Sequence, residues 1–274
     1  MRKFSLLALA LLVTAVSAFA QVDLAKVKDG FYFAQDGKFS SSGWKEQAVV
    51  EVKGGKIVDA TWNGVSNIAG AVDKLAYSAA GKYGMVKASK IKAEWNAQAK
   101  ATTDYLVKTQ DVSFSKFDKD GKTDAITGAT MTVSGFYALV KQALASAPVA
   151  KGVYKDGWYF AQQAEFDKNS GWKDTALVTV VNGSVVDLVW NGVYKDPTKK
   201  SKIVEAVSGK YGMAKAAKKG EWNVQANAVE AAIVKAGDPA KIAMKADGTS
   251  DAISGASIHL TVVTLAIDAL KAAK

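Results

Sequence analysis

The chain has 274 residues, of which 49% are hydrophobic, 23% are charged and only 3 are proline, so it is long enough to build about two domains with their own cores. Its formal net charge of +10 favours anionic partners, but the lysines are scattered and no basic cluster or nucleic-acid-binding motif points to DNA or RNA. The sequence contains no cysteine, which excludes disulfides, thiolate metal sites, cysteine nucleophiles and a lipid anchor on cysteine.

The first 20 residues have the features of a secretory signal peptide. Arg2 and Lys3 precede the apolar run Leu6 to Val13, and Ala18-Phe19-Ala20 forms an A-x-A cleavage site. No later apolar segment has the length of a membrane span. We therefore expect an exported protein, periplasmic or extracellular, that is not lipid-anchored.

The rest of the chain is a tandem repeat. The matched stretches are GFYFAQ (30–35) with GWYFAQ (157–162), GWK (43–45) with GWK (171–173), WNG (62–64) with WNG (190–192), GKYGM (81–85) with GKYGM (209–213), and EWN (94–96) with EWN (221–223). This order predicts two homologous domains, residues 21–147 and 148–274, joined by a short linker near Pro148.

Three strands are expected at the start of each half. In the first half, Phe31 to Ala34 is rich in aromatic residues and Ala48 to Val52 is apolar and β-branched. Lys53-Gly54-Gly55 then forms a hairpin turn into Ile57 to Trp62, and Asn182-Gly183 marks the same turn in the second half.

Helices are expected after the strands, because apolar residues recur at helical spacing. These residues are Ile68, Val72, Leu75 and Ala79 in the first half, Trp222, Ala226, Val229 and Ile233 in the second, and in the two closing helices Val133, Phe136, Tyr137, Val140 and Leu144, and Leu260, Val263, Ile267 and Leu270. Helices on one face of an antiparallel sheet predict an α+β fold with two homologous domains, each a small antiparallel sheet packed with helices.

A short motif precedes each closing helix. Its two copies are Asp124-Ala125-Ile126-Thr127-Gly128-Ala129-Thr130 and Asp251-Ala252-Ile253-Ser254-Gly255-Ala256-Ser257. A loop that leads into a helix N-terminus combines free N–H groups with a positive dipole end, which suits a phosphate, and a hydroxyl there could carry that phosphate covalently. An ordinary N-cap would explain a single copy. Two copies at the same place in two repeats favour a binding site.

The motifs resemble those of the FMN-binding domain family, which includes the C subunit of the sodium-pumping NADH:quinone reductase and the G subunit of the Rnf complex. The likeness covers TDAITGATMTVSGFYALVKQAL and the opening stretches DGFYFAQ and VVEVKGGKIVDATWNG, and nearly the whole mature chain takes part. It implies that FMN is attached through a phosphoester bond to the last hydroxyl of the motif, which is Thr130. The second copy departs from the pattern because it ends in Ser257, followed by Ile258-His259.

The resemblance implies an electron carrier with one covalent FMN in each domain, and not an enzyme. The implied partners are an FAD-dependent flavin transferase that installs the FMN, and redox donor and acceptor proteins at the membrane. The cofactor-binding residues would be those of the two motifs: Asp124, Thr127, Gly128, Ala129, Thr130, Asp251, Ser254, Gly255, Ala256 and Ser257. Trp62 and Trp190 are candidates to shield the flavin ring, and core packing of a duplicated fold is the other interpretation of such paired tryptophans.

Two other functions fit the sequence. One is a module that binds free flavin reversibly, and the other is a secreted glycan-binding or adhesion repeat that uses the paired tryptophans as sugar platforms. Catalysis by the single His259 is not expected, because it has no counterpart in the first half and is too close to Ser257 in the chain to serve as its base. Asp118-x-Asp120-Gly121 lacks the later ligands of a calcium loop and is interpreted as a β-turn.

Overall fold

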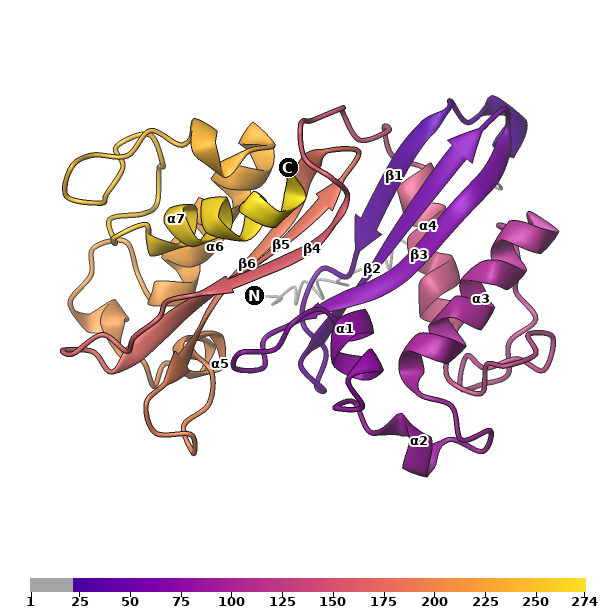
Figure 1. Ribbon diagram of the computed structural model, residues 1–274, viewed down its shortest axis with the longest axis horizontal. Helices are drawn as coiled ribbons and strands as arrows, with labels where there is room; N and C mark the ends of the chain where they lie inside the picture. Colours follow the sequence, from indigo (N-terminus) through magenta and orange to yellow (C-terminus); the bar gives the residue numbers. More distant parts are fainter. Residues whose placement is uncertain (1–21) are drawn as a thin grey trace, which may run out of the picture.

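The computed structural model describes residues 22–274, so the predicted signal peptide, residues 1–20, lies outside the described residues. We refer to residues 22–147 as domain 1 and to residues 148–274 as domain 2. Each contains a three-stranded antiparallel sheet, with its strands in sequential order, and helices packed on one face (Figure 1). The predicted α+β fold with two similar domains is confirmed. None of the helices among the described residues combines the length and hydrophobicity needed to cross a bilayer.

The two domains repeat the same elements. Domain 1 consists of β1 (Gly30–Gln35), β2 (Trp44–Lys53), β3 (Lys56–Ser66), α1 (Lys74–Ala79), α2 (Met85–Ala88), α3 (Trp95–Thr109) and α4 (Ser134–Leu144). Domain 2 consists of β4 (Gly157–Gln162), β5 (Trp172–Val181), β6 (Ser184–Tyr194), α5 (Lys202–Val207), α6 (Trp222–Ala236) and α7 (Thr261–Ala269). Where domain 1 has α2, domain 2 has a 3-10 turn, Met213–Lys215.

The three predicted strands of domain 1 are present and are longer than predicted. The hairpin turn between β2 and β3 is confirmed, with Gly54 and Gly55 at φ values of 58° and 71° that glycine adopts without strain. The prediction that helix α1 includes Ile68 and Val72 is wrong, because the helix starts later in the chain. Helix α1 begins at Lys74, because the Asp73 side chain caps its N-terminus.

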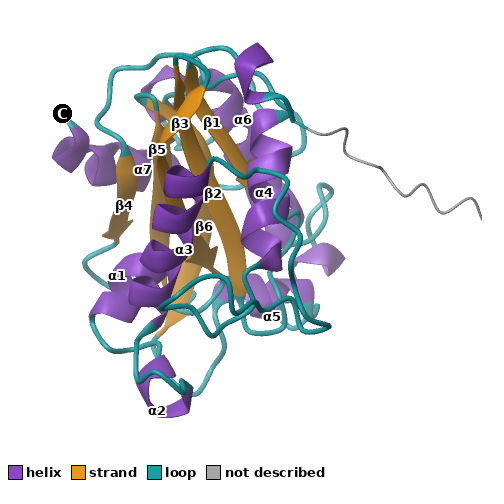
Figure 2. Ribbon diagram, turned by 90° about the vertical axis from the view of Figure 1, so that its right-hand side faces the viewer, coloured by secondary structure: helices purple, strands orange, loops and turns teal. Residues whose placement is uncertain are grey.

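One face of each sheet packs against its helices and forms the core of that domain. In domain 1, α3 and α4 cover the sheet, as Figure 2 shows from the helix side. In domain 2, α6 and α7 cover the sheet in the same way. Strand β5 is buried along nearly its whole length, whereas β2 also has half-buried and exposed positions. This difference indicates that a second layer covers the other face of the domain 2 sheet.

That second layer is the sheet of domain 1. The two sheets lie face to face in the middle of the molecule, with the helices outside them (Figure 1). A small apolar cluster joins Val65 of domain 1 to Leu177 and Val189 of domain 2, and Phe39 packs against it. The molecule is therefore layered as helices, sheet, sheet and helices.

Asp187 is the centre of the polar part of this interface. Its carboxylate accepts hydrogen bonds from Gln35 Nε2 at 2.9 Å, Lys45 Nζ at 3.0 Å and Gln47 Nε2 at 2.9 Å. Gln47 is fully buried, and its Oε1 accepts a hydrogen bond from Trp158 Nε1 at 2.7 Å. Because a buried polar group without a partner is costly, this network favours one arrangement of the domains over others.

The linker between the domains is fixed by hydrogen bonds. The Val149 N–H donates to the Phe31 carbonyl at 2.7 Å, and the Gly152 N–H donates to the Asn182 carbonyl at 2.8 Å. The Asn182 side chain donates back to the Val149 carbonyl at 2.7 Å. The linker therefore ties β1 of domain 1 to the β5–β6 turn of domain 2.

Candidate functional site

Each D-x-x-[ST]-G-A-[ST] motif forms a loop that lies against the long helix of its domain. Ile126 and Ile253 are 2% and 6% exposed and anchor the two loops in the cores. Gly128 and Gly255 have φ values of 92° and 96°, which are strained for any other residue. A Cβ on Gly128 would also lie 3.2 Å from Ala101 Cβ in α3. The motif glycine therefore allows both the turn and the close approach to the helix.

The last hydroxyl residue of each motif is hydrogen-bonded to a buried glutamine of that helix. The Thr130 N–H and Oγ1 donate to Gln98 Oε1 at 2.8 and 3.2 Å. The Ser257 N–H and Oγ donate to Gln225 Oε1 at 2.8 and 3.2 Å. Both glutamines are fully buried. The hydroxyl groups of Thr130 and Ser257, which are at equivalent positions of the repeat, therefore have the same hydrogen-bond geometry.

The two glutamines were not among the predicted site residues. Their signal in the sequence is the repeated E-W-N-x-Q stretch, which runs from Glu94 to Gln98 and from Glu221 to Gln225. The Glu94 carboxylate accepts a hydrogen bond from the Met85 N–H at 2.9 Å, and Glu221 makes the equivalent contact in domain 2. The stretch therefore holds two loops at once, the motif loop through its glutamine and the preceding turn through its glutamate.

The motif hydroxyls do not lie at a helix N-terminus, contrary to the prediction. Helix α4 begins at Ser134, four positions after Thr130, and the N-cap residue Val133 makes no side-chain cap. The N–H groups of Val133 and Ser134 both donate to the Gly121 carbonyl, at 2.9 and 3.1 Å. Helix α7 begins with the same spacing after Ser257. The first N–H groups of α4 are therefore occupied by the turn that precedes the motif.

A cavity of about 720 Å³ opens beside Thr130. Its charged lining residues are Lys90, Lys116, Lys122, Asp118, Asp120 and Asp124. Among the motif residues, Asp124, Ala129 and Thr130 line this cavity, whereas Thr127 and Gly128 do not. Trp62 does not line it either and faces a different groove. Lysine ammonium groups next to a hydroxyl suit a phosphate ester, because charge-assisted hydrogen bonds are the strong ones.

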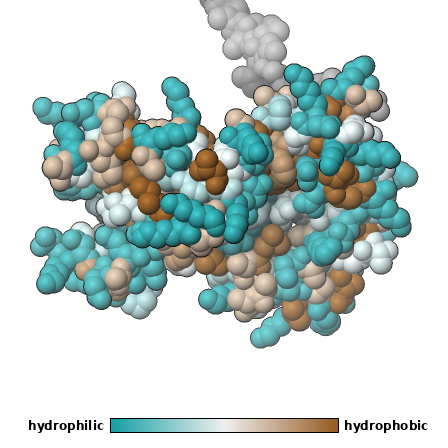
Figure 3. Space-filling view, turned by 45° about the horizontal axis from the view of Figure 1, so that its top comes forward, coloured by the Kyte–Doolittle hydropathy of each residue, from teal (hydrophilic) through white to brown (hydrophobic). Residues whose placement is uncertain are grey.

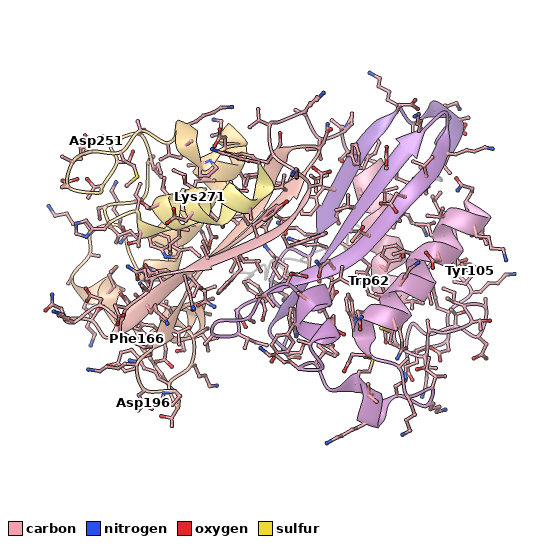
Figure 4. All side chains as sticks on the ribbon, in the orientation of Figure 1. Trp62, Tyr105, Phe166, Asp196, Asp251 and Lys271 are labelled. Atoms are coloured by element: carbon pink, nitrogen blue, oxygen red, sulfur yellow. The ribbon has the colours of Figure 1, made fainter. Side chains whose placement is uncertain are left out.

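The cavity beside Ser257 is smaller, about 310 Å³, and has a different lining. Its aromatic and charged lining residues are Trp172, Trp190, Trp222, Tyr211, His259, Lys202, Asp167 and Asp174. Trp190 and Ser257 therefore line the same cavity. Ser254, Gly255, Ala256 and Asp251 do not line the cavity. The Asp251 side chain is 85% exposed and pairs with Lys245 at 3.0 Å on the outer loop of domain 2 (Figure 4).

Each domain contains a buried lysine among aromatic rings. Lys74 Nζ lies 4.3 Å from the centroid of the Trp95 ring and forms an ion pair with Glu46, which also accepts a hydrogen bond from Trp62 Nε1 at 3.0 Å. Burial raises the pKa of the Glu46 carboxyl, and the neighbouring ammonium acts in the opposite direction. The counterparts in domain 2 are Lys202, Trp222, Asp174 and Trp190. This ion pair and its aromatic contacts fix the tryptophan rings in place.

Six tryptophans occupy matched positions in the repeat and are core residues: Trp44 and Trp172, Trp62 and Trp190, and Trp95 and Trp222. Their exposed fractions range from 1% for Trp190 to 5% for Trp62. A sugar platform needs an exposed ring face, so the interpretation of these tryptophans as glycan platforms is wrong. Packing in the shared core of a duplicated fold, the other interpretation, is confirmed.

The Asp118 stretch is a turn, as predicted. Asp118 Oδ1 accepts hydrogen bonds from the N–H groups of Asp120 at 2.9 Å and Lys122 at 2.8 Å. Across residues 22–274, the structure contains no group of three or more acidic or histidine side chains placed to hold a metal ion. The aspartates of this stretch therefore shape the loop at the mouth of the Thr130 cavity.

Glu230 of α6 is a half-buried acid in the groove where the two domains meet. Its Oε1 accepts a hydrogen bond from the Trp190 N–H at 2.6 Å. Burial raises the pKa of Glu230 to about 8; the charge of Asp187 acts in the same direction, and Lys45 opposes it. Between about pH 4.5 and 8 the folded chain thus keeps a proton that the unfolded chain releases.

The stability of the fold should therefore decrease as the pH rises from 5 to 8. The slope from Glu230 is at most about 1.4 kcal/mol per pH unit, and Glu230→Gln should remove it. Urea unfolding of both proteins across this pH range measures the difference. The exposed Glu165→Gln is the control and should keep the original slope. Equal slopes for the Glu230→Gln protein and the unchanged protein would contradict the assignment.

Comparisons with known proteins gave no matching family model and no matching curated protein. Two solved structures resemble parts of the chain. An NMR structure of a Clostridium thermocellum protein is 43% identical, covers 44% of this chain and 95% of its own, and has a TM-score of 0.35. A crystal structure of a Clostridium perfringens protein is 24% identical, covers 43% of this chain and 87% of its own, and has a TM-score of 0.33. Each of these similar proteins corresponds to roughly half of the chain.

Proposed function

We propose that this protein is an exported flavoprotein that carries electrons on FMN, linked covalently through phosphoester bonds to Thr130 and, at lower occupancy, to Ser257. The observation that supports the proposal most is the duplicated contact of these two hydroxyl residues with buried Gln98 and Gln225. Bound FMN would supply the redox chemistry, and the protein would supply attachment, shielding and orientation. The protein is a carrier and not an enzyme.

The surroundings of Thr130 fit a phosphate ester. Thr130 is half-buried at the wall of its cavity, and its hydroxyl donates a hydrogen bond to Gln98 Oε1. Attachment would replace the hydroxyl proton by phosphorus, and the hydrogen bond from the Thr130 N–H to Gln98 would remain. Lys90, Lys116 and Lys122 line the same cavity and would supply ammonium groups to pair with a phosphate, although Asp118, Asp120 and Asp124 make the charge of the lining as a whole close to neutral. A volume of about 720 Å³ lies within the roughly 300–1,000 Å³ range of small-molecule sites.

The surroundings of Ser257 fit the same group less well. The positions of Lys116 and Lys122 are taken by Ala243 and Thr249, so this site has fewer cations for a phosphate. Ser257 itself is exposed, and its cavity is less than half the volume of the first. Trp190 lines this cavity but is only 1% exposed, so it offers little ring surface to a flavin. These differences support a lower occupancy at the second site.

The partners follow from this chemistry. An FAD-dependent flavin transferase outside the cytoplasm would install the FMN, and redox donor and acceptor proteins at the membrane would exchange electrons with it. The exposed Asp124 and Asp251 are accessible to such a transferase. Reversible binding of free flavin is the competing function, and it differs in one observable, because flavin held without a bond is lost when the protein is denatured.

Thr130→Ala should remove the FMN of domain 1. In a host that exports the protein and contains the transferase, we expect the denatured unchanged protein to remain fluorescent. The variant should lose one FMN equivalent in its intact mass. Thr109→Ala is the control, because Thr109 is an exposed hydroxyl residue of domain 1 that lies outside both the motif and the cavity lining, and this variant should keep the full mass. A Thr130→Ala protein with an unchanged mass shift would contradict attachment at this residue.

Ser257→Thr should raise the occupancy of the second site. The added methyl group restrains χ1, so the hydroxyl spends more time in the position held by Gln225. Peptide mapping of the 251–257 segment, before and after the substitution, measures the modified fraction. If the segment carries no FMN in either protein while Thr130 is fully modified, domain 2 has no covalent flavin.

A further inference from the structure

Both domains contain the same groove beside the long helix. In domain 1 it lies between β3, α1 and α3, and in domain 2 between β6, α5 and α6. The matched lining residues include Trp62 and Trp190, Leu75 and Ile203, and Ala99 and Ala226. Because the duplication places equivalent residues in both linings, the two grooves can be compared position by position.

The groove of domain 2 is covered by a loop from domain 1. Gly37, Lys38 and Phe39 of the β1–β2 loop complete its lining, and the enclosed volume is about 330 Å³. Phe39 and Ile203, which both line this groove, pack against the apolar cluster between the domains. The groove of domain 1 is larger, about 530 Å³, and all the residues that line it belong to domain 1. One groove is therefore covered within the chain, and its equivalent is open.

The loop equivalent to the covering loop lies at the far end of domain 2. It connects β4 to β5, and Phe166 takes the position of Phe39. Lys173 Nζ lies 4.9 Å from the centroid of the Phe166 ring, as Lys45 Nζ lies 5.6 Å from that of Phe39. Phe166 is 37% exposed. The face of the molecule in Figure 3 is mostly hydrophilic, with hydrophobic side chains in small groups. The domain 2 loop thus has the form of the covering loop; its Gln163, Asp167 and Ser170 line the Ser257 cavity of their own domain, and Phe166 remains partly exposed.

The open groove and the β4–β5 loop lie in opposite halves of the molecule. Figure 4 places Trp62, which lines the groove, among the helices of domain 1, and Phe166 at the outer end of domain 2. We propose that the β4–β5 loop of one copy of this chain inserts Phe166 into the domain 1 groove of a second copy. The contact is heterologous, so it joins chains head to tail and closes into a ring or continues as a filament.

The β4–β5 loop of domain 2 and the groove of domain 1 carry charges that can pair. Within the chain, Lys38 lies in the groove lining with Glu230 and Asn227. In the β4–β5 loop of domain 2, Glu165 takes the position of Lys38. In the groove of domain 1, Lys100 takes the position of Asn227. Glu165 would therefore meet Lys100, a cation that also pairs with Asp104 of the same helix at 2.6 Å, and uncharged Thr103 takes the position of Glu230.

A second ion pair of the intrachain interface would have a counterpart between the two copies of the chain. Asp187 of domain 2 pairs with Lys45 of domain 1 at 3.0 Å within the chain. Their counterparts are Asp59, which is exposed and lines the open groove, and Lys173, which lies beside Phe166. The intrachain interface leaves Asp59 and Phe166 accessible, so a second chain can dock without displacing it.

Sedimentation velocity of the purified chain over a range of concentrations tests this proposal. We expect concentration-dependent association, which Phe166→Ala weakens by about tenfold or more, because the substitution removes the apolar side chain that would be buried. Val153→Ala removes another exposed apolar side chain, 79% exposed, and should leave association unchanged. A chain that sediments as a monomer at every concentration, or a Phe166→Ala protein that associates normally, would overturn the proposal.

Charge exchange tests the pairing directly. Glu165→Lys and Lys100→Glu should each weaken association, because each places like charges together. The double variant should recover most of the loss, since the pair is restored with its signs exchanged. Single variants that associate as well as the unchanged protein, or a double variant weaker than both, would overturn the pairing of Glu165 with Lys100.

Discussion

Asp187→Ala is expected to lower the free energy of unfolding by about 3–5 kcal/mol, the typical cost of removing one partner from a buried ion pair. Lys45 and Asp187 have side chains only 13% and 8% exposed, so the remaining ammonium would lie in the interface without its partner. Gln47, which is fully buried, would also lose the acceptor of one of its hydrogen bonds. The loss affects the interface between the sheets more than either core.

Equilibrium urea unfolding followed by fluorescence and by circular dichroism measures this effect. If the two domains lose their coupling, the single transition should separate into two. Asp59→Ala is the matched control, because Asp59 occupies the same position in domain 1, is exposed, and should change stability by less than about 0.5 kcal/mol. Equal effects of the two substitutions would show that the Asp187 network does not stabilise the domain pairing.

Gly152→Ala is expected to destabilise the chain by about 3 kcal/mol or more, at the upper end of the range for inserting atoms into packed structure. A Cβ at this position would lie 2.0 Å from the Gly183 carbonyl oxygen and 2.7 Å from the Ser184 nitrogen. Both are backbone atoms of the β5–β6 turn, so no side chain can rotate away. The linker would have to move and break the hydrogen bond from the Gly152 N–H to Asn182.

Thermal and urea unfolding of the Gly152→Ala protein measure the loss. The contrasting substitution is Gly135→Ala in α4, where a Cβ would meet nothing within 4 Å. There the change should stabilise the protein by up to about 1 kcal/mol, because alanine is the better helix former. A Gly152→Ala protein as stable as the unchanged chain would mean that the linker is not held against the turn.

Much of the fold could be predicted from the sequence because its signals are local and occur twice. The hairpin at Gly54-Gly55 is specified by residues that tolerate positive φ. The buried stripe of α6, from Trp222 to Ile233, follows directly from apolar spacing. These elements form for reasons contained within about 15 residues of chain, so the pattern is sufficient.

The incorrect elements have tertiary causes. Ile68 and Val72 have helical spacing, but the segment is a loop in which the Asn67 carbonyl accepts hydrogen bonds from the side chains of Asn191 and Ser201 in domain 2. Ile267, predicted to face the core from α7, is 37% exposed. A contact from the other domain cannot be read from the periodicity of this one.

The sequence by itself determined that Thr130 and Ser257 are equivalent, because a duplicated motif needs no coordinates to align. Only the tertiary structure decided what surrounds them: Gln98 and Gln225 lie 32 residues before the hydroxyls that they hold, and the cavities differ in size and lining. The packing of the two sheets against each other was also decided only by the tertiary structure. Equivalent residues such as Asp59 and Asp187 have different environments, because a contact between unlike surfaces of two similar domains buries one copy and leaves the other exposed.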